Sequence, residues 1–111
     1  MTAQMIEKRC SHSAVVHLNK IYLIGGKNET SILNSAEVFD IDTQQFSLMK
    51  SMEVPRCSFA ATIIGEKIYC FDGDRFRSYV EWFNLITEEW KTEKKISKLP
   101  FCFGAVNMYG N

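Results

Sequence analysis

The chain has 111 residues, of which 46% are hydrophobic and 23% charged, and its 13 basic side chains balance its 13 acidic ones. This composition is that of an ordinary globular domain and excludes a disordered chain. Because there is no net positive charge to attract phosphate groups or anionic lipid, we expect neither nucleic acid nor a membrane surface as a partner.

The N-terminus gives no sign of export. Its first ten residues, MTAQMIEKRC, lack the apolar segment of a secretory signal, and the longest apolar runs are far shorter than a membrane span. We therefore predict a cytoplasmic protein. In that reducing compartment the four cysteines are expected as free thiols: Cys10, Cys57, Cys70 and Cys102.

Four short strands are predicted in the first half of the chain, because brief apolar runs alternate with Asn, Gly, Asp and Thr turn signals. They span residues 12–18, 21–25, 35–41 and 45–49. A tight turn joins the first two strands, as in an antiparallel hairpin. These two strands carry apolar residues on both faces, which predicts that neighbouring sheets cover both.

The second half of the chain repeats the first. Residues 9–26, RCSHSAVVHLNKIYLIGG, align without a gap with residues 56–73, RCSFAATIIGEKIYCFDG. A third copy begins near the C-terminus with LPFCFGAVNMYGN. Units of this length that cannot bury both faces alone stack radially as the blades of a β-propeller.

We predict one domain, residues 1–111, that is a partial propeller. It contains a first repeat at residues 5–51, a second at 52–96 and the start of a third at 97–111. Since a propeller closes with about four to eight blades, this number of repeats cannot close a ring. The sequence therefore predicts one of three states: a fragment of a longer protein, an assembly of several copies through the open edge of the stack, or an open partial stack with an exposed apolar flank.

Glycines, a glutamate and two aromatic residues recur at matching positions. In the first repeat they are Gly25, Gly26, Glu37, Phe39 and Phe46; in the second they are Gly73, Glu81, Phe83 and Trp90. A methionine also stands four residues before an arginine, at Met5 and Arg9 and again at Met52 and Arg56. These features resemble kelch repeats, and the resemblance implies an all-β fold of four-stranded antiparallel kelch blades.

The chain departs from the kelch pattern at two positions, with Asp72 in place of a first glycine and Phe46 where the family usually has Trp. Gly26 aligns with Gly73, whereas Gly25 aligns with Asp72. We therefore expect the second glycine to require positive φ and the first position to tolerate a Cβ.

The resemblance implies a non-enzymatic protein-interaction module. Many kelch proteins carry such a propeller beside a BTB domain and present substrates to a cullin-RING ubiquitin ligase, so we predict a fragment of such an adaptor. The alternatives are an actin-binding or cytoskeleton-binding kelch protein and a kelch-fold enzyme. No cofactor and no metal are predicted, because no catalytic set and no phosphate-binding loop occur in the sequence.

In the kelch adaptors that this chain resembles, one rim of the propeller binds the partner, through residues that precede the innermost strand or follow the glycine pair. At those positions this chain has Arg9, Ser11, Lys27, Asn28, Arg56, Ser58, Arg75, Phe76 and Arg77. Guanidinium groups bind carboxylates and an exposed Phe provides an anchor, so the predicted partner is another protein, with an acidic peptide segment or actin as candidates.

Some of these residues have a structural alternative. Arg9 and Arg56 could recur because every blade needs the same carbonyl or glutamate partner. Glu37 and Glu81 are expected to accept backbone hydrogen bonds rather than to act in catalysis. Cys10, Cys57 and Cys102 share one repeat position without CxxC spacing, and His12 aligns with Phe59, so all four are expected to fill apolar space.

Overall fold

The structure is a computed structural model that describes residues 4–71 and 80–93, and these residues form two four-stranded antiparallel sheets. Blade 1 contains β1 (Ser13–His17), β2 (Lys20–Ile24), β3 (Ala36–Asp40) and β4 (Gln45–Leu48). Blade 2 contains β5 (Ala60–Ile64), β6 (Lys67–Phe71), β7 (Val80–Asn84) and β8 (Glu89–Glu93). The predicted all-β fold of four-stranded antiparallel blades is confirmed.

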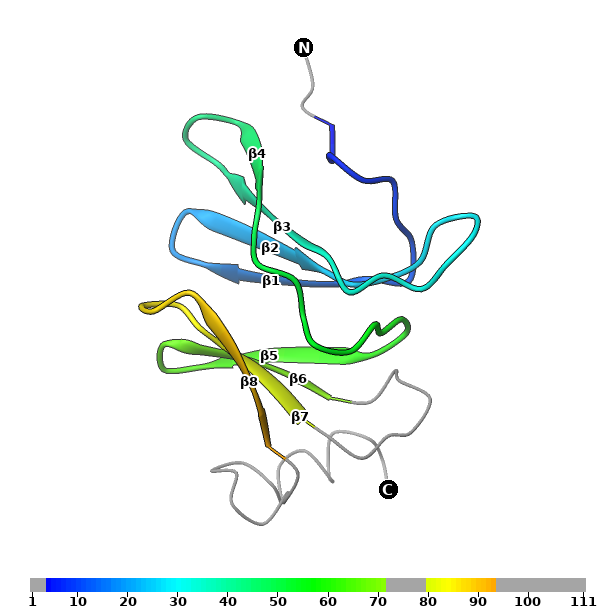
Figure 1. The fold of residues 1–111 in the computed structure, drawn as a ribbon. Coiled ribbons are helices and arrows are strands. Elements are labelled where there is room, and N and C mark those ends of the chain that lie inside the picture. The colour runs from blue at the N-terminus through cyan, green and yellow to red at the C-terminus, as the bar shows by residue number, and fades with distance from the viewer. Residues whose placement is uncertain (1–3, 72–79, 94–111) are drawn as a thin grey trace.

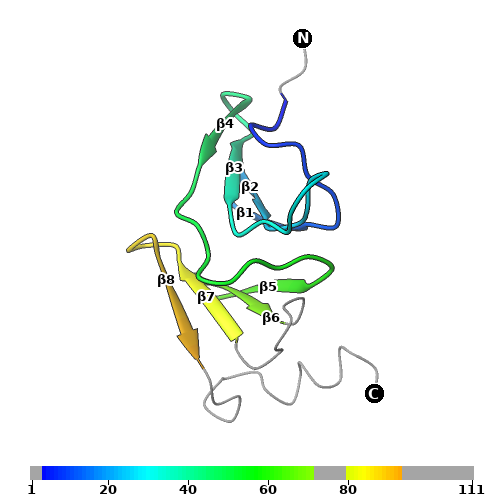
Figure 2. The same cartoon turned by 45° about the vertical axis from the view of Figure 1, so that its right-hand side comes forward.

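Within each blade the strands lie side by side in chain order. The two sheets are stacked, with β1 of blade 1 beside β5 of blade 2 (Figures 1 and 2). The outermost strands, β4 and β8, therefore lie on the outside of the stack. No helix that could cross a membrane is found in the part of the chain that the structure describes.

An acceptor side chain at the end of the third strand shapes the turn that follows it. In blade 1, Asp40 Oδ1 accepts hydrogen bonds from the backbone amides of Asp42 (2.9 Å) and Thr43 (3.1 Å). These bonds, the one from Thr43 above all, hold the pKa of Asp40 below its usual value. Asn84 does the same at the equivalent position of blade 2. A short Asp or Asn side chain thus closes the outer hairpin in both repeats.

The main apolar core lies between the blades. Alternate residues along each strand point to opposite faces, and one face of blade 1 meets one face of blade 2. Blade 1 contributes Val15, Tyr22, Ile24, Ala36 and Val38, and blade 2 contributes Ala61, Ile63, Ile68, Cys70, Phe83 and Trp90. The prediction that both faces of the first hairpin are covered holds only for its Val15 face, because Val16 and Leu18 are exposed.

The glycine pair lies where the second blade approaches the first. Both Gly25 (φ +65°) and Gly26 (φ +96°) have positive φ, so the expectation that the first position tolerates a Cβ is wrong in blade 1. A Cβ on Gly25 would lie 2.7 Å from the carbonyl oxygen of Arg56, which already accepts a 2.7 Å hydrogen bond from the Gly26 amide. The glycines therefore permit close contact between backbones of different blades. Asp72 and Gly73 lie outside the described residues.

Replacement of Gly25 by Ala is predicted to destabilise the fold more than replacement of Gly65, although the two have nearly equal φ (+65° and +62°). Nothing lies within 4 Å of a Cβ on Gly65, so Gly65→Ala should cost only the conformational term of about 1 kcal/mol. Gly25→Ala should cost about 2 kcal/mol more, because its Cβ meets backbone atoms. Urea unfolding of both variants measures the difference, and equal losses would show that the close approach to Arg56 contributes nothing.

Candidate functional site

A lead segment, residues 5–9 in blade 1 and 52–56 in blade 2, runs into each sheet and is held by the glutamate of the third strand. Glu37 accepts hydrogen bonds from the backbone amides of Ile6 and Glu7, both at 2.8 Å. Glu81 accepts equivalent bonds from the amides of residues 53 (2.6 Å) and 54 (3.2 Å). Both carboxylates are fully buried, so in this structure each fixes a segment of backbone and does not face solvent.

The recurring arginines pair with these glutamates. Arg9 Nη2 lies 2.8 Å from Glu37 Oε2, and Arg56 donates to Glu81 Oε1 from both Nε (3.2 Å) and Nη2 (3.0 Å). Arg9 Nη1 also donates to the carbonyl oxygen of Gly25 at 2.8 Å. All four charged side chains are fully buried.

Of the two roles considered for Arg9 and Arg56, the structure favours the structural one. A buried ion pair is favoured where further hydrogen bonds reach the charged groups. Here backbone amides donate to both carboxylates, and the carbonyl oxygens of Gly25 and Ser35 accept from Arg9 Nη1, although the buried Arg9 Nε has no partner among the described residues. Neither guanidinium group reaches solvent, so neither is placed to bind a carboxylate of a partner. The arginines instead hold the lead segments beneath the rim residues that follow them.

Arg56→Met is predicted to destabilise the protein by about 3–5 kcal/mol, because it leaves the buried Glu81 carboxylate without its counter-charge. Lys20→Met, which removes the partly exposed Lys20–Asp40 pair at 3.7 Å, is the control and should leave the urea midpoint nearly unchanged. The measurement is equilibrium unfolding of both variants. If Arg56→Met were as stable as the wild type, Arg56 would not have the structural role described above.

The residues that follow the arginines are exposed and have strained backbone. Ser11 (φ 56°) and Ser58 (φ 52°) both adopt positive φ, which costs a residue other than glycine about 1 kcal/mol. The Ser58 amide donates to the Ser11 carbonyl oxygen at 2.8 Å, so the two serines are neighbours on adjacent blades. Their exposed side chains therefore form part of a continuous rim.

The loop after the glycine pair lies against the same region. Lys27 exchanges backbone hydrogen bonds with Cys10, at 3.0 and 2.8 Å, and its side chain is exposed. Asn28 Oδ1 accepts from the backbone amides of Thr30 and Ser31, and its Nδ2 donates to Glu7 Oε2 at 3.2 Å. The structure thus brings Ser11, Lys27 and Asn28 together. The other predicted rim residues, Arg75, Phe76 and Arg77, lie outside the described residues.

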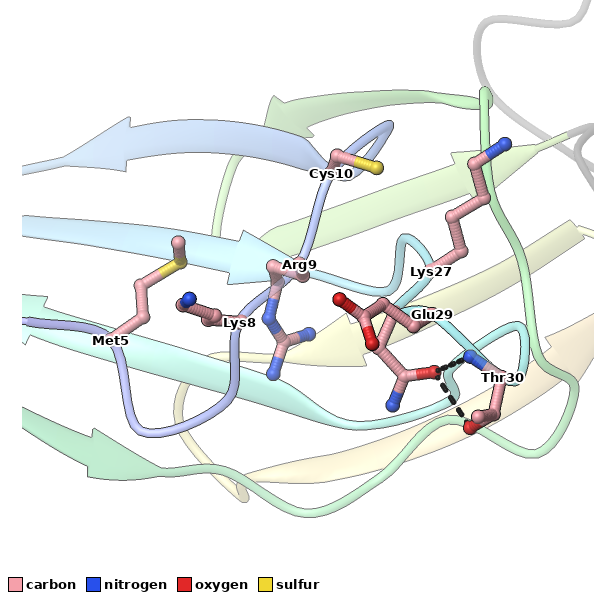
Figure 3. Close-up of a pocket in the computed structure, with 8 residues that line it drawn as sticks. Met5, Lys8, Arg9, Cys10, Lys27, Glu29 and Thr30 are labelled. Carbon is pink, nitrogen blue, oxygen red and sulfur yellow. Dashed lines mark hydrogen bonds between the residues drawn. The ribbon is translucent and has the colours of Figure 1, made fainter.

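A groove of about 640 Å³ lies between the lead segment of blade 1 and this loop. It is lined by Met5, Lys8, Arg9, Cys10, Lys27, Asn28, Glu29 and Thr30 (Figure 3). Five of these residues are not among the rim residues predicted from the sequence: Met5, Lys8, Cys10, Glu29 and Thr30. No sequence signal marks Lys8, because its position depends on the burial of the neighbouring Arg9, which no local pattern reveals.

The cysteines and His12 differ in part from expectation. Cys10 is exposed and Cys57 is partly exposed, so the prediction of buried apolar filling is wrong for both. Cys70 is buried, and burial raises the pKa of its thiol well above the usual value. Burial, and then the nearby Arg9 guanidinium, lower the pKa of His12. No cluster of three metal-binding side chains occurs among residues 4–71 and 80–93.

Comparison with known proteins matches both blades to one family. A family profile for the Kelch motif matches residues 8–53 and again residues 55–95. Kelch-like protein 7 of Rattus norvegicus is 26% identical over 99 residues, which cover 86% of this chain and 17% of that protein. Kelch-like protein 41b of Danio rerio is 31% identical over 104 residues, covering 90% of this chain and 17% of that protein.

A viral protein is also similar. Kelch repeat and BTB domain-containing protein 2 of Cowpox virus (strain Brighton Red) is 29% identical over 81 residues, which cover 73% of this chain and 14% of that protein. The chain therefore spans about a sixth of the length of these relatives.

Proposed function

Because the chain belongs to the kelch-repeat family, we propose that it is a non-enzymatic module that binds another protein through the rim at the start of its innermost strands. The observation that carries the proposal is the repeated serine at this rim. Ser11 and Ser58 are exposed, adjacent and held at positive φ in both described blades. Strained residues that persist at a surface are typical of functional sites.

The exposed cations of the groove suit an acidic segment of a partner. Among the described residues that line the groove, Lys8 and Lys27 contribute two exposed ammonium groups, against one exposed carboxylate, that of Glu29. Arg9 adds no net charge at the surface, because Glu37 neutralises it. The proposed binding surface comprises Lys8, Ser11, Lys27, Asn28 and Ser58, and we include in the proposal Arg75, Phe76 and Arg77, which lie outside the described residues.

We further propose that the chain acts in the cytoplasm as the substrate-binding part of a ubiquitin-ligase adaptor. One relative is named for the combination of kelch repeats with a BTB domain. In such an arrangement the rim recognises the substrate, and a separate domain contacts the ligase. A propeller rim suits this task, since its loops converge on one surface and carry no chemistry of their own.

The double variant Lys8→Glu, Lys27→Glu is predicted to weaken partner binding by roughly tenfold or more, because it reverses the charge of the groove. Both side chains are exposed, so the melting temperature should not change. The tagged protein is purified from its source cells, and co-purified proteins are quantified by mass spectrometry. The adaptor role predicts a cullin among the co-purified proteins. It also predicts that, when the protein is depleted from the cells, one co-purified partner carries less ubiquitin.

Lys91→Glu is the matched control, since Lys91 is exposed on β8, away from the groove. Every partner should remain bound to this variant. If the groove variant and the control lose the same partners, or if neither loses any, the rim is not the binding surface. If a rim-dependent partner is found without a cullin and without a change in its ubiquitin, the adaptor role fails while the interaction module stands.

A further inference from the structure

We propose that the end of the two blades opposite the rim is a second binding surface, and that it binds a basic segment of a partner protein in which apolar side chains lie between the lysines and arginines. This surface, the turn end, consists of the four hairpin turns and the strand residues beside them: residues 17–20, 40–45, 64–67 and 84–89. It shares no residue with the rim, so the proposal stands independently of the rim function.

The four hairpin turns lie at the same end of the blades. In each antiparallel sheet the strands follow chain order, so the first and third connections leave by one end and the second connection by the other. Figure 1 shows all four turns on the left, whereas the lead segment of blade 1 and the loop between β2 and β3 lie on the right. The turn end is therefore remote from the groove.

Contacts between the turns join them into one surface. In blade 1 the Ile41 amide donates to the carbonyl oxygen of Asn19 at 2.9 Å, and in blade 2 the Leu85 amide donates to that of Glu66 at 2.8 Å. His17 Nε2 of blade 1 lies 3.8 Å from Glu66 Oε1 of blade 2. A partner that covers one turn therefore reaches its neighbours in both blades.

Large apolar side chains are exposed on the turn end, although turns are usually built from polar residues and glycine. Leu18 is 84% exposed, Ile86 72% and Ile41 43%. The fold of the repeat does not require the first two, because the other blade has Gly65 at the position of Leu18 and Asp42 at that of Ile86. Apolar side chains that gather on a surface without a structural need mark an interaction site.

Leu18 is also strained. Its φ is 57°, in the left-handed region that a bulky side chain rarely adopts, whereas blade 2 places Gly65 (φ 62°) there. Because Leu18 is so exposed, packing within the described residues offsets little of this strain. A partner that buries the side chain would account for both the strain and the exposure.

The charge of the turn end indicates the chemistry of the partner. Its residues include five acids and two lysines: Asp40, Asp42, Glu66, Glu88 and Glu89 against Lys20 and Lys67. The lysines are held within the protein, because Lys20 Nζ lies 3.7 Å from Asp40 Oδ2 and Lys67 Nζ lies 4.4 Å from the ring centroid of Trp82. All the acids except Asp40 are exposed. The turn end is thus mainly negative, and its partner must supply cations.

Three of these acids are not needed by the fold. At the positions of Glu66, Glu88 and Glu89, blade 1 has the uncharged residues Asn19, Gln44 and Gln45. Gln44 (φ 58°) and Glu88 (φ 61°) have the same backbone conformation, so an amide side chain serves this turn as well as a carboxylate does. The carboxylates are therefore available for recognition.

A segment with alternating cations and apolar side chains matches this pattern. Its apolar side chains would cover Leu18, Ile41 and Ile86, and its cations would pair with the carboxylates around them. The apolar contacts supply most of the affinity, and the charge pairs set the orientation and the rate of association. The same negative charge excludes nucleic acid and anionic lipid as occupants.

The test selects binders of the 111-residue chain from a phage-displayed library of random peptides. One class of selected peptides should be enriched in Lys and Arg together with Leu, Ile and Phe, and depleted in Asp and Glu. Fluorescence anisotropy then measures the affinity of these peptides for the wild type and for two turn-end variants. Any acidic peptides selected by the rim form a separate class, so failure at one surface is distinguishable from failure at the other.

The first variant, Leu18→Gly, should weaken binding of the basic class roughly tenfold or more, because it removes apolar contact area. The second, Glu66→Asn with Glu88→Gln, should weaken it by roughly tenfold and make the affinity less sensitive to salt. Each new residue already stands at the matching position of the other blade, so both variants should fold. Circular dichroism checks that they do.

Glu29→Gln with Glu53→Gln is the matched control, since it removes two exposed carboxylates that lie outside the turn end. It should leave the affinity within about twofold of the wild type. The proposal is overturned if no basic, apolar class is selected, or if either turn-end variant binds that class as tightly as the wild type. It is equally overturned if the control weakens binding as much as the turn-end variants do.

Discussion

The buried ion pair between Arg56 and Glu81 is the contact on which the arrangement of the two blades depends. One carboxylate on β7 binds the guanidinium group and two backbone amides of the lead segment, so that segment is fixed to blade 2. The carbonyl group of Arg56 is thereby placed to accept the Gly26 amide of blade 1. Transfer of both charges out of water is costly, and the hydrogen bonds around them offset that cost. The Arg9–Glu37 pair repeats the arrangement in blade 1.

This use of the arginines decides what remains for function. Because the recurring arginines and glutamates pair with each other inside the blades, the described part of the rim carries small polar side chains on strained backbone and a few exposed lysines. The buried pairs act on the rim only indirectly, by holding Ser11 and Ser58 at the ends of the lead segments. The residues that bind a partner are thus separate from those that hold the blades together. The rim side chains can differ between proteins with different partners, whereas the arginine and the glutamate of each blade must be kept as a pair.

The strands were predictable to within one residue in blade 1, because turn residues such as Asp40 lie directly at their ends. The aromatic and glutamate positions were equally predictable from the sequence, since each repeats once per blade. The roles of Arg9 and Arg56 could not be predicted, because a charged residue normally lies at the surface and no local pattern reveals a buried partner more than twenty residues away. That Gly25 does not tolerate a Cβ could not be predicted for the same reason, because the clash involves the carbonyl oxygen of Arg56 in the other blade.

Native-state hydrogen exchange at the backbone amides of Glu53 and Val54 tests the central claim most directly. These amides lie outside any strand, and Glu81 is their hydrogen-bond acceptor. If the buried pair fixes the lead segment, they should exchange as slowly as the central amides of β6 and β7, within about tenfold, because all would open only with the blade. Exchange at the rate of an exposed loop would contradict the account, since the lead segment would then open independently of the sheet.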